Sequence, residues 1–445
     1  MMDEKQIPQV RVGIMNEPML DVVFNGEYRV GGAACTGEHH MTCADGQVLW
    51  NGQRYGELLF EPVDADAASF TLKAVTIGVS FHWKRQEDQT FKGALHIIVE
   101  NDKLTPVNVL SVEDYLLSVI SSEMSANASL ELLKAHAVIS RSWLLAQIHT
   151  EETVHRAERR PDEPGEMMDT PDEQVKWWDR DDHVNFDVCA DDHCQRYQGI
   201  TMATNRHVEE AVRQTRGQIL TSDGEICDAR FGKCCGGVTE EFQYCWENSP
   251  KSYLKSVSDT AAAAVVPDLT VEAAARKWIL SEPEAFCNTH DKKILSQVLN
   301  DYDQETRDFY RWHVDYTQSE LAGIIDEKLN MDFGDIVDLI PLDRGRSGRI
   351  WRLKIVGTKR TFIIGKELEI RRALSKSHLY SSAFVVDRQE IVDGVPQRFR
   401  IDGAGWGHGV GLCQIGAAVM GEQGYKYDQI LLHYYSGAEI EKIYK

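Results

Sequence analysis

One carboxylate of this chain continues the apolar face of a predicted helix. Ser111 is suited to cap a helix, and apolar residues recur after it at helical spacing. These residues are Val112, Tyr115, Leu116, Val119 and Ile120. Glu123 continues the same stripe, so its carboxyl group should face the interior, where burial and the helix dipole favour the protonated form. Glu123 is therefore a candidate general acid, unless it pairs with a buried cation or bonds to amides of the next helix.

The next predicted helix, over residues 129–148, carries two cations. Lys134 and Arg141 lie seven residues apart and so share one face of this helix. Arg141 interrupts an apolar stripe, and we expect it to be partly buried beside an anion. That anion is either Glu123 or a carboxylate of the substrate. The two alternatives predict opposite protonation of Glu123, because a close cation would keep it ionised.

Residues 403–411 carry glycine at every second position. In an extended chain, one face of this segment would be bare backbone and the other would present Trp406 and His408. Five glycines in alternation indicate close approach of a ligand or of another backbone. The segment contains neither a dinucleotide-binding fingerprint nor a Walker lysine. A ligand-binding strand and a tightly packed structural strand both fit the pattern.

A short segment after residue 182 holds two histidines and two cysteines. The four residues are His183, Cys189, His193 and Cys194. Two imidazoles and two thiolates suit a tetrahedral zinc ion, although the spacing differs from that of a zinc finger. Reduced thiols or a local disulfide are the alternatives.

Composition and charge exclude several classes of protein. The 445 residues carry a formal net charge of −22, which disfavours non-specific nucleic-acid binding. No apolar run is long enough to span a membrane. The N-terminus lacks the pattern of a secretory signal, so we expect either an intracellular protein or one whose signal is not in this sequence. Ten cysteines are too few for a disulfide scaffold in a chain of this length, and we expect most to be buried thiols.

The order of predicted elements indicates an α+β fold, with β-rich and helical subdomains and a substrate groove between them. Residues 9–110 read as strands, helical patterns follow from residue 111, and strand patterns return at residue 351. We expect a β-rich region over 1–90, a first core part over 91–260, a helical subdomain over 261–345 and a C-terminal part with a glycine-rich strand over 346–445. The acidic stretch 150–182 should be a surface insertion.

Three ordered motifs together resemble the SpoIID/LytB family. Residues 113–124 (EDYLLSVISSEM) and 132–141 (LLKAHAVISR) are similar to its opening motif. Residues 235–240 (CGGVTE) are similar to its central motif. Residues 406–417 (WGHGVGLCQIGA) and 430–437 (ILLHYYSG) are similar to its closing motif. Three motifs in the family's order make chance an unsatisfactory explanation.

The resemblance implies action on peptidoglycan. SpoIID-like enzymes are lytic transglycosylases that cut the MurNAc–GlcNAc bond of glycan strands without stem peptides, and their single catalytic glutamate falls on Glu123. A groove lined by Lys134, Arg141, Trp406, His408 and Gln414 would then bind the glycan. The resemblance also implies a structural zinc ion on the His/Cys segment, a location in the cell envelope, and an N-acetylmuramoyl-L-alanine amidase as a partner.

Two other functions remain open. The first is a non-catalytic amidase enhancer or peptidoglycan-binding module, in which the same groove binds without cutting. The second is thiol chemistry from Cys235 or Cys413 with His408. The chain also departs from the family's pattern: the family usually has glutamine where His136 stands, and Tyr-His-Ser before the central motif, where this chain has residues 231–234 (FGKC).

Overall fold

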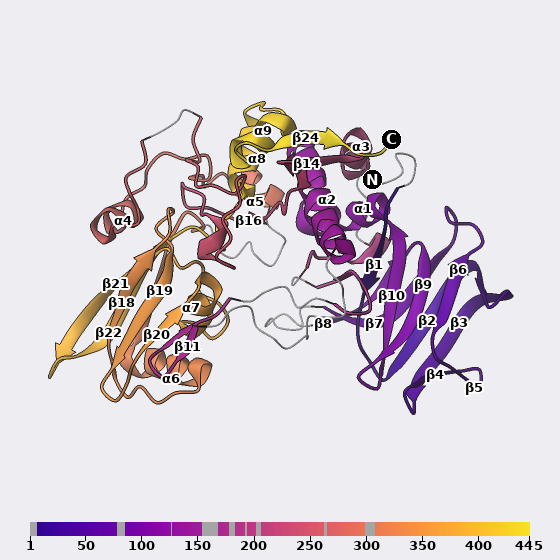
Figure 1. Ribbon diagram of the computed structural model, residues 1–445, viewed down its shortest axis with the longest axis horizontal. Coiled ribbons are helices and arrows are strands. Elements are labelled where there is room, and N and C mark those ends of the chain that lie inside the picture. Colours follow the sequence, from indigo (N-terminus) through magenta and orange to yellow (C-terminus); the bar gives the residue numbers. More distant parts are fainter. Residues whose placement is uncertain are drawn as a thin grey trace.

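The computed structural model describes residues 7–77, 85–125, 127–153, 168–177, 183–191, 194–201, 206–261, 265–298 and 308–445. The fold is a mixed α+β fold, as expected. Two β-rich parts stand on either side of a central helical part (Figure 1). None of the helices in the described ranges is long and apolar enough to cross a membrane.

The N-terminal β-rich part is one large sheet with strand order β13-β1-β10-β9-β6-β2-β3-β4-β5, to which β7 and β8 are added through β2. Alternating apolar residues such as Leu20, Val22 and Phe24 in β2 bury one face of it. Its strands are β1 (Gln9–Gly13), β2 (Met19–Val30), β3 (Ala33–Ala44), β4 (Gln47–Trp50), β5 (Gln53–Tyr55), β6 (Leu58–Pro62), β7 (Ser69–Ile77), β8 (Arg85–Phe91), β9 (Ala94–Glu100), β10 (Lys103–Ser111) and β13 (Val188–Cys189). The strand reading of residues 9–110 is confirmed for the described residues.

The central part begins where this sheet ends. β10 stops at Ser111, whose hydroxyl accepts from the Asp114 N–H at 3.1 Å and caps α1, as the sequence predicts. The elements are α1 (Val112–Glu123), α2 (Leu130–Thr153), α3 (Arg206–Gln214), α5 (Lys292–Val298), α8 (Gln414–Glu422), α9 (Tyr427–Tyr434), β14 (Gln218–Ser222), β15 (Glu225–Ile226), β16 (Phe231–Gly232), β23 (Leu412–Cys413) and β24 (Glu439–Lys442). Because β24 pairs with β14, the C-terminal segment is tied to the same part (Figure 1).

The second β-rich part contains two smaller sheets, β11-β12-β20-β19-β18 and β17-β22-β21. Its elements are β11 (Met168–Thr170), β12 (Glu173–Val175), β17 (Arg311–Thr317), β18 (Ile336–Arg344), β19 (Ile350–Gly357), β20 (Thr361–Gly365), β21 (Phe384–Val392), β22 (Val395–Ala404), α6 (Gln318–Leu329) and α7 (Glu367–Ala373), with α4 (Glu272–Ile279) beside β21. The helical patterns at 271–279 and 319–329 thus correspond to α4 and α6.

Two sequence-based boundaries are wrong. β17 and β18 lie inside the range 261–345 that we expected to be helical, and they pair with β22 and β19 from beyond residue 346. Within the supposed surface insertion 150–182, β12 pairs in parallel with β20. These strands pair with partners that are far away in the sequence. A local sequence pattern therefore could not predict the pairing. The rest of that insertion, residues 154–167 and 178–182, lies outside the described residues.

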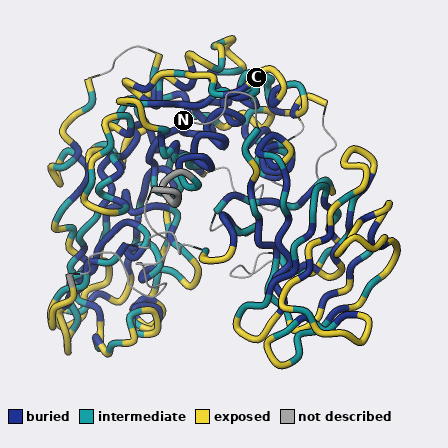
Figure 2. The backbone as a smooth tube through the Cα atoms, turned by 45° about the vertical axis from the view of Figure 1, so that its right-hand side comes forward, coloured by how far each residue is buried: buried dark blue, intermediate teal, exposed yellow. Residues whose placement is uncertain are grey.

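The two largest hydrophobic cores of the described residues organise the molecule. The larger one joins the N-terminal sheet to the central helices, with Phe60 and Phe70 from the sheet and Val119 and Leu133 from α1 and α2. The other lies within residues 312–401. Figure 2 shows buried backbone concentrated in the central part and inside both β-rich parts. Since α1 shares a core with the N-terminal sheet, the sheet fixes the direction in which the end of α1 points.

Candidate functional site

Glu123 is the last residue of α1. The residues that precede it on the same stripe, Leu116, Val119 and Ile120, are completely buried, so the predicted apolar face is confirmed. Glu123 itself is half-buried. The helix ends directly after it, where the Met124 N–H donates to the Ile120 carbonyl. The carboxyl group therefore sits at the margin of the core, in partial contact with solvent.

Arg141 is fully buried, and its partner is neither of the two anions that we expected. Its guanidinium forms two hydrogen bonds with Glu113, from Nε to Oε1 at 3.0 Å and from Nη2 to Oε2 at 2.9 Å. Glu113 also accepts from the Tyr444 hydroxyl at 2.6 Å. With both ends of the guanidinium engaged inside the protein, Arg141 joins α1, α2 and the C-terminal segment. We expected Arg141 to contact Glu123 or the substrate, and the structure instead pairs it with Glu113.

Two other expected substrate-binding residues also face protein groups. The ammonium of Lys134 lies 2.9 Å from Oε1 of Glu131, and its side chain is 12% exposed. Gln414 is 4% exposed, and its side-chain amide lies 3.3 Å from Nε2 of His136. Burial lowers the pKa of His136 to about 3, so its ring is neutral at pH 7. Gln414 and His136 therefore form a buried neutral contact between α8 and α2.

The alternating glycines do not form the extended strand that we expected. Gly405, Gly407, Gly409 and Gly411 all have positive φ, between 73° and 89°. Only glycine adopts this conformation without strain, which is why glycine recurs at these positions. A Cβ at Gly411 would collide with the Arg230 carbonyl. Residues 405–411 are hereafter called the glycine ribbon, and close approach of another backbone, one of the two anticipated reasons, is confirmed.

The glycine ribbon presents two aromatic rings. Trp406 is half-buried and stacks on Tyr380 with ring centroids 4.2 Å apart, and Phe309 lies 4.7 Å from it. His408 is half-buried and lies 5.0 Å from Trp246 in an edge-on arrangement. The indole is therefore partly exposed, with Tyr380 stacked on it and Phe309 beside it.

His408 has a defined protonation state. Burial, together with the smaller effects of the nearby Arg230, Arg349 and Arg371, lowers its pKa to about 3. The Val410 N–H donates to Nδ1 at 3.0 Å, which places the proton of the neutral ring on Nε2. The ring also forms a hydrogen bond with the backbone of Phe231, so His408 is a neutral group at pH 7 that ties the glycine ribbon to β16.

The end of α1 contacts the segment that leads toward the glycine ribbon. Two residues after Glu123, the Ser125 N–H donates to the Gln297 carbonyl at 2.9 Å, which anchors the chain to the end of α5. The next residue of α5, Val298, accepts from the ammonium of Lys233 at 3.2 Å. The chain around Lys233 thus meets the same helix end as the chain around Glu123.

Residues 231–235 then lie directly against the glycine ribbon. β16 pairs in parallel with β23, with Gly232 opposite Cys413. The side of Gly232 faces the His408 ring, and a Cβ placed there would lie 3.6 Å from Cε1. A series of contacts therefore connects the neighbourhood of Glu123 to His408 through α5 and residues 231–235.

Three of the four predicted zinc ligands come together. The ligand atoms of His183, Cys189 and Cys194 all lie within 4.8 Å of one another, and Nε2 of His183 lies 3.5 Å from Sγ of Cys194. His193 lies outside the described residues. Two thiols and one imidazole fit a zinc ion, and His193 stays the predicted fourth ligand.

This His/Cys cluster is anchored to α1. The Gln198 N–H donates to the Ser118 hydroxyl at 3.0 Å, and Tyr197 stacks on Tyr115 with centroids 5.2 Å apart. Burial raises the pKa of Tyr115, and the nearby thiols of Cys194 and Cys189 raise it further. A metal ion there would hold this segment against the helix that carries Glu123.

Sequence reasoning missed one group of residues. Cys235, Asp259, Cys287 and Cys413 are all buried, and their ligand atoms lie within 4.8 Å of one another. Burial raises the pKa of Asp259 to about 7. Cys235 and Cys413 belong to recognised motifs, but no spacing in the sequence connects them to Asp259 or Cys287. Seven of the ten cysteines are buried thiols, which confirms the expectation for most of them.

A cavity of about 470 Å³ lies elsewhere, and its lining residues are Val238, Ser256, Val257, Ser258, Thr260, Ala261, Val266 and His433. None of the predicted site residues lines it. It is therefore distinct from the surroundings of Glu123 and Trp406.

Comparison with known proteins supports the motif-based resemblance. A family model described as stage II sporulation protein matches residues 100–222, and one described as a domain of unknown function (DUF8618) matches residues 240–411. An uncharacterized protein of Brachyspira hyodysenteriae is 25% identical over 79% of this chain and 72% of its own length. Stage II sporulation protein D of Bacillus subtilis is 24% identical, over 76% of each chain.

The amidase enhancer of Bacillus subtilis is 23% identical over 73% of this chain, a match that spans 40% of the enhancer's own length. Glu123 and the His/Cys cluster both lie within residues 100–222, the range matched by the sporulation-protein family. The resemblance predicted from the motifs is therefore confirmed: the chain contains a SpoIID-family domain and is related to stage II sporulation protein D and the amidase enhancer.

Proposed function

We propose that this protein is a peptidoglycan lytic transglycosylase of the cell envelope, with Glu123 as its general acid and base. The proposal rests mainly on one observation: a half-buried carboxyl group ends an otherwise fully buried helix stripe, inside the SpoIID-family domain. Partial exposure leaves this carboxyl group within reach of a substrate, as a general acid requires.

The reaction needs only one carboxyl group. Glu123 donates its proton to O4 of the GlcNAc residue as the bond from C1 of MurNAc to that oxygen breaks. The resulting carboxylate then takes the proton of the MurNAc 6-hydroxyl as O6 bonds to C1. The products are a GlcNAc 4-hydroxyl end and a 1,6-anhydro-MurNAc end, and no water is consumed. Because the substrate supplies the nucleophile, the second carboxylate of most glycosidases is not required.

The remaining parts of the site position the glycan. The Trp406 ring would stack on a sugar. His408, whose neutral ring bonds to the backbone of Val410 and Phe231, would line the groove beside it. A zinc ion held by His183, Cys189 and Cys194, with His193 as fourth ligand, would be structural, because protein ligands fill every coordination position. Thiol chemistry is disfavoured, since Cys235 and Cys413 are 3% and 2% exposed.

A non-catalytic amidase enhancer is the second candidate. It is favoured by the internal pairing of Arg141 with Glu113 and by the burial of Gln414, which remove two expected contacts to the glycan. It also agrees with the name of the Bacillus subtilis relative. An N-acetylmuramoyl-L-alanine amidase would then be the partner.

Mass spectrometry of products from peptide-free glycan strands separates the two functions. The purified transglycosylase releases 1,6-anhydro products, whereas an enhancer gives none without an amidase. The matched control for Glu123→Gln is Glu27→Gln, which makes the same chemical change at an exposed position of β2. Activity in the control and its loss in Glu123→Gln would support the proposal. Equal anhydro yields from both variants would contradict it.

A further inference from the structure

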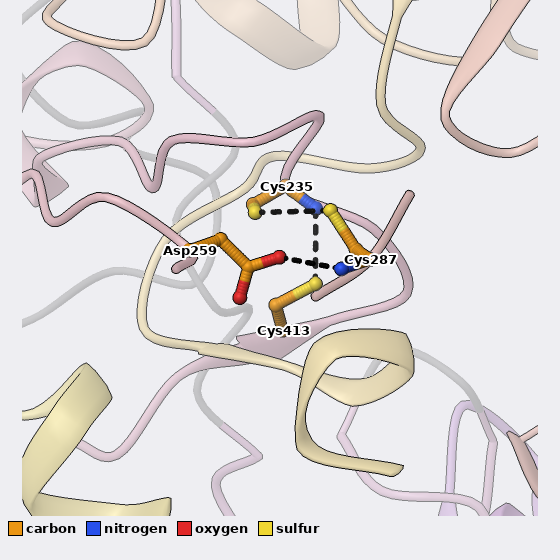
Figure 3. Close-up of side chains that lie close together, drawn as sticks. All are labelled: Cys235, Asp259, Cys287 and Cys413. Carbon is orange, nitrogen blue, oxygen red and sulfur yellow. Dashed lines mark hydrogen bonds between the residues drawn. The ribbon is translucent and has the colours of Figure 1, made fainter. Parts of the chain in front are cut away.

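Four buried side chains from distant segments meet at one point beside the glycine ribbon. Figure 3 shows Cys235, Cys287 and Cys413 directed toward one another, with the carboxyl group of Asp259 beside them. Their ligand atoms all lie within 4.8 Å of one another. The four residues, hereafter the Cys₃Asp cluster, are between 0% and 3% exposed.

The spacing of the sulfur atoms suits bonds to one ion. Sγ of Cys235 and Sγ of Cys287 are 3.7 Å apart. Two Zn–S bonds of about 2.3 Å at a tetrahedral angle separate the two sulfur atoms by about 3.8 Å. A disulfide requires about 2.05 Å, and it would leave the thiol of Cys413 without a partner cysteine in the cluster.

Surrounding groups already orient the ligands. The Cys287 N–H donates to Oδ2 of Asp259 at 2.8 Å, and the Tyr434 hydroxyl donates to Oδ1 at 2.6 Å. The Cys235 N–H donates to Sγ of Cys413 at 3.3 Å. Hydrogen bonds of this kind, made to the ligand atoms by neighbouring groups, are typical of metal sites.

Hydrogen bonds, and not an ion pair, hold Asp259 within the described part of the chain. Among the described residues, no lysine, arginine or histidine forms an ion pair with Asp259. A buried carboxylate is costly unless it is paired or coordinates a metal. A divalent cation at the centre would balance the negative charges of the carboxylate and of the deprotonated thiols.

We propose that Cys235, Asp259, Cys287 and Cys413 form a second metal site, which holds a structural zinc ion. Three thiolates and one carboxylate are suitable ligands for zinc, and four protein ligands leave no open position for catalysis. This site is separate from the His/Cys cluster, because the two sets share no residue. The proposal does not depend on transglycosylase activity.

The zinc ion would fix the glycine ribbon. Cys413 lies two residues after the end of the ribbon, and a Cβ at Gly405 would lie 2.9 Å from the carbonyl carbon of Cys235. One ion would thus join both ends of the ribbon to the segments that carry Asp259 and Cys287. Cross-links between segments so far apart in sequence restrict the unfolded chain strongly.

The first test is the zinc content of the full-length protein after removal of the His/Cys cluster by Cys189→Ser/Cys194→Ser. We expect this double variant to retain about one zinc per chain, measured by inductively coupled plasma mass spectrometry. Adding Cys413→Ser should remove it. A folded double variant without zinc, or with iron in its place, would overturn the proposal, as would a Cys235–Cys287 disulfide in a peptide map made without reduction.

A second measurement covers the case in which the Cys413→Ser protein does not fold. X-ray absorption at the zinc edge of the double variant should show three sulfur ligands at about 2.3 Å and one oxygen at about 2.0 Å. Cys234→Ser is the matched control, because Cys234 is buried, contacts Cys287 and Cys413, and is not among the proposed ligands. Four sulfur ligands, or zinc loss in Cys234→Ser but not in Asp259→Asn, would contradict the assigned ligands.

Discussion

Glu113 and Arg141 form a fully enclosed, two-pronged ion pair between the first turn of α1 and the middle of α2. Glu113 further accepts from Tyr444, 331 residues away in the chain. The pair therefore links the opening motif to the C-terminal segment. Of the two glutamates of α1, Glu113 is thus enclosed in this pair, whereas Glu123 is half-buried at the other end of the helix.

Breaking this pair should destabilise the protein strongly. Glu113→Gln leaves the Arg141 charge buried without a counter-charge, and we expect the free energy of unfolding to fall by about 3–5 kcal/mol. Urea denaturation measures the change. Lys73→Ala is the control, because its pair with Asp88 is exposed and screened by solvent, so we expect a much smaller loss of stability. Equal losses in the two variants would contradict the buried pair.

The sequence predicted that Arg141 needs an anion, but it could not identify Glu113. An acidic residue in the first turn of a helix is usually explained by the helix dipole, in solvent. Glu113 is instead buried against Tyr444, a residue that no local sequence pattern connects to Glu113. By contrast, the Ser111 cap and the stripe ending at Glu123 were predictable, because helical periodicity is local.

The glycine ribbon failed as a strand prediction for a different reason. Alternation with a period of two indicates a strand only when residues have negative φ, and glycine removes that restriction. The Cys₃Asp cluster had no signal at all, since its members are brought together by tertiary packing. The cluster of His183, Cys189 and Cys194 was predictable because its members lie close together in sequence.

Alanine substitutions at two glycines of the ribbon should reduce the free energy of unfolding by different amounts. Gly407 and Gly409 both have positive φ, so each alanine variant should lose about 1–2 kcal/mol from backbone strain. A Cβ at Gly409 would also collide with the guanidinium of Arg349, whereas nothing lies within 4 Å of one at Gly407. Gly409→Ala should therefore lose about 1–3 kcal/mol more in thermal or urea unfolding. Indistinguishable losses would refute the close contact with Arg349.

His136 should make the protein sensitive to acid. Its pKa is about 3 in the folded protein, against an ordinary value of 6.5, so the unfolded state takes up a proton first as the pH falls. The contribution of neutral His136 to the free energy of unfolding is fully present above pH 6.5. It decreases as the pH falls below 6.5, by about 2 kcal/mol at pH 5. His136→Gln keeps a hydrogen-bonding group beside Gln414 and removes the titration.

Urea unfolding at pH 7 and at pH 5 measures this effect. The loss of stability between the two pH values should be about 2 kcal/mol smaller in His136→Gln than in the unmodified protein. His290→Gln is the control, because its side chain is exposed, and it should leave the loss unchanged. The same loss in all three proteins would show that His136 is not responsible.

The catalytic role of Glu123 is tested most directly by measuring glycan binding and turnover on the same variant. Glu123→Gln keeps the size of the side chain and its capacity for hydrogen bonds but cannot exchange a proton in the reaction. We expect its Kd for peptide-free glycan strands to stay within a few-fold of the unmodified protein, while the release of 1,6-anhydro ends falls by about 10²- to 10⁴-fold. Unchanged release from a properly folded Glu123→Gln protein would contradict the account.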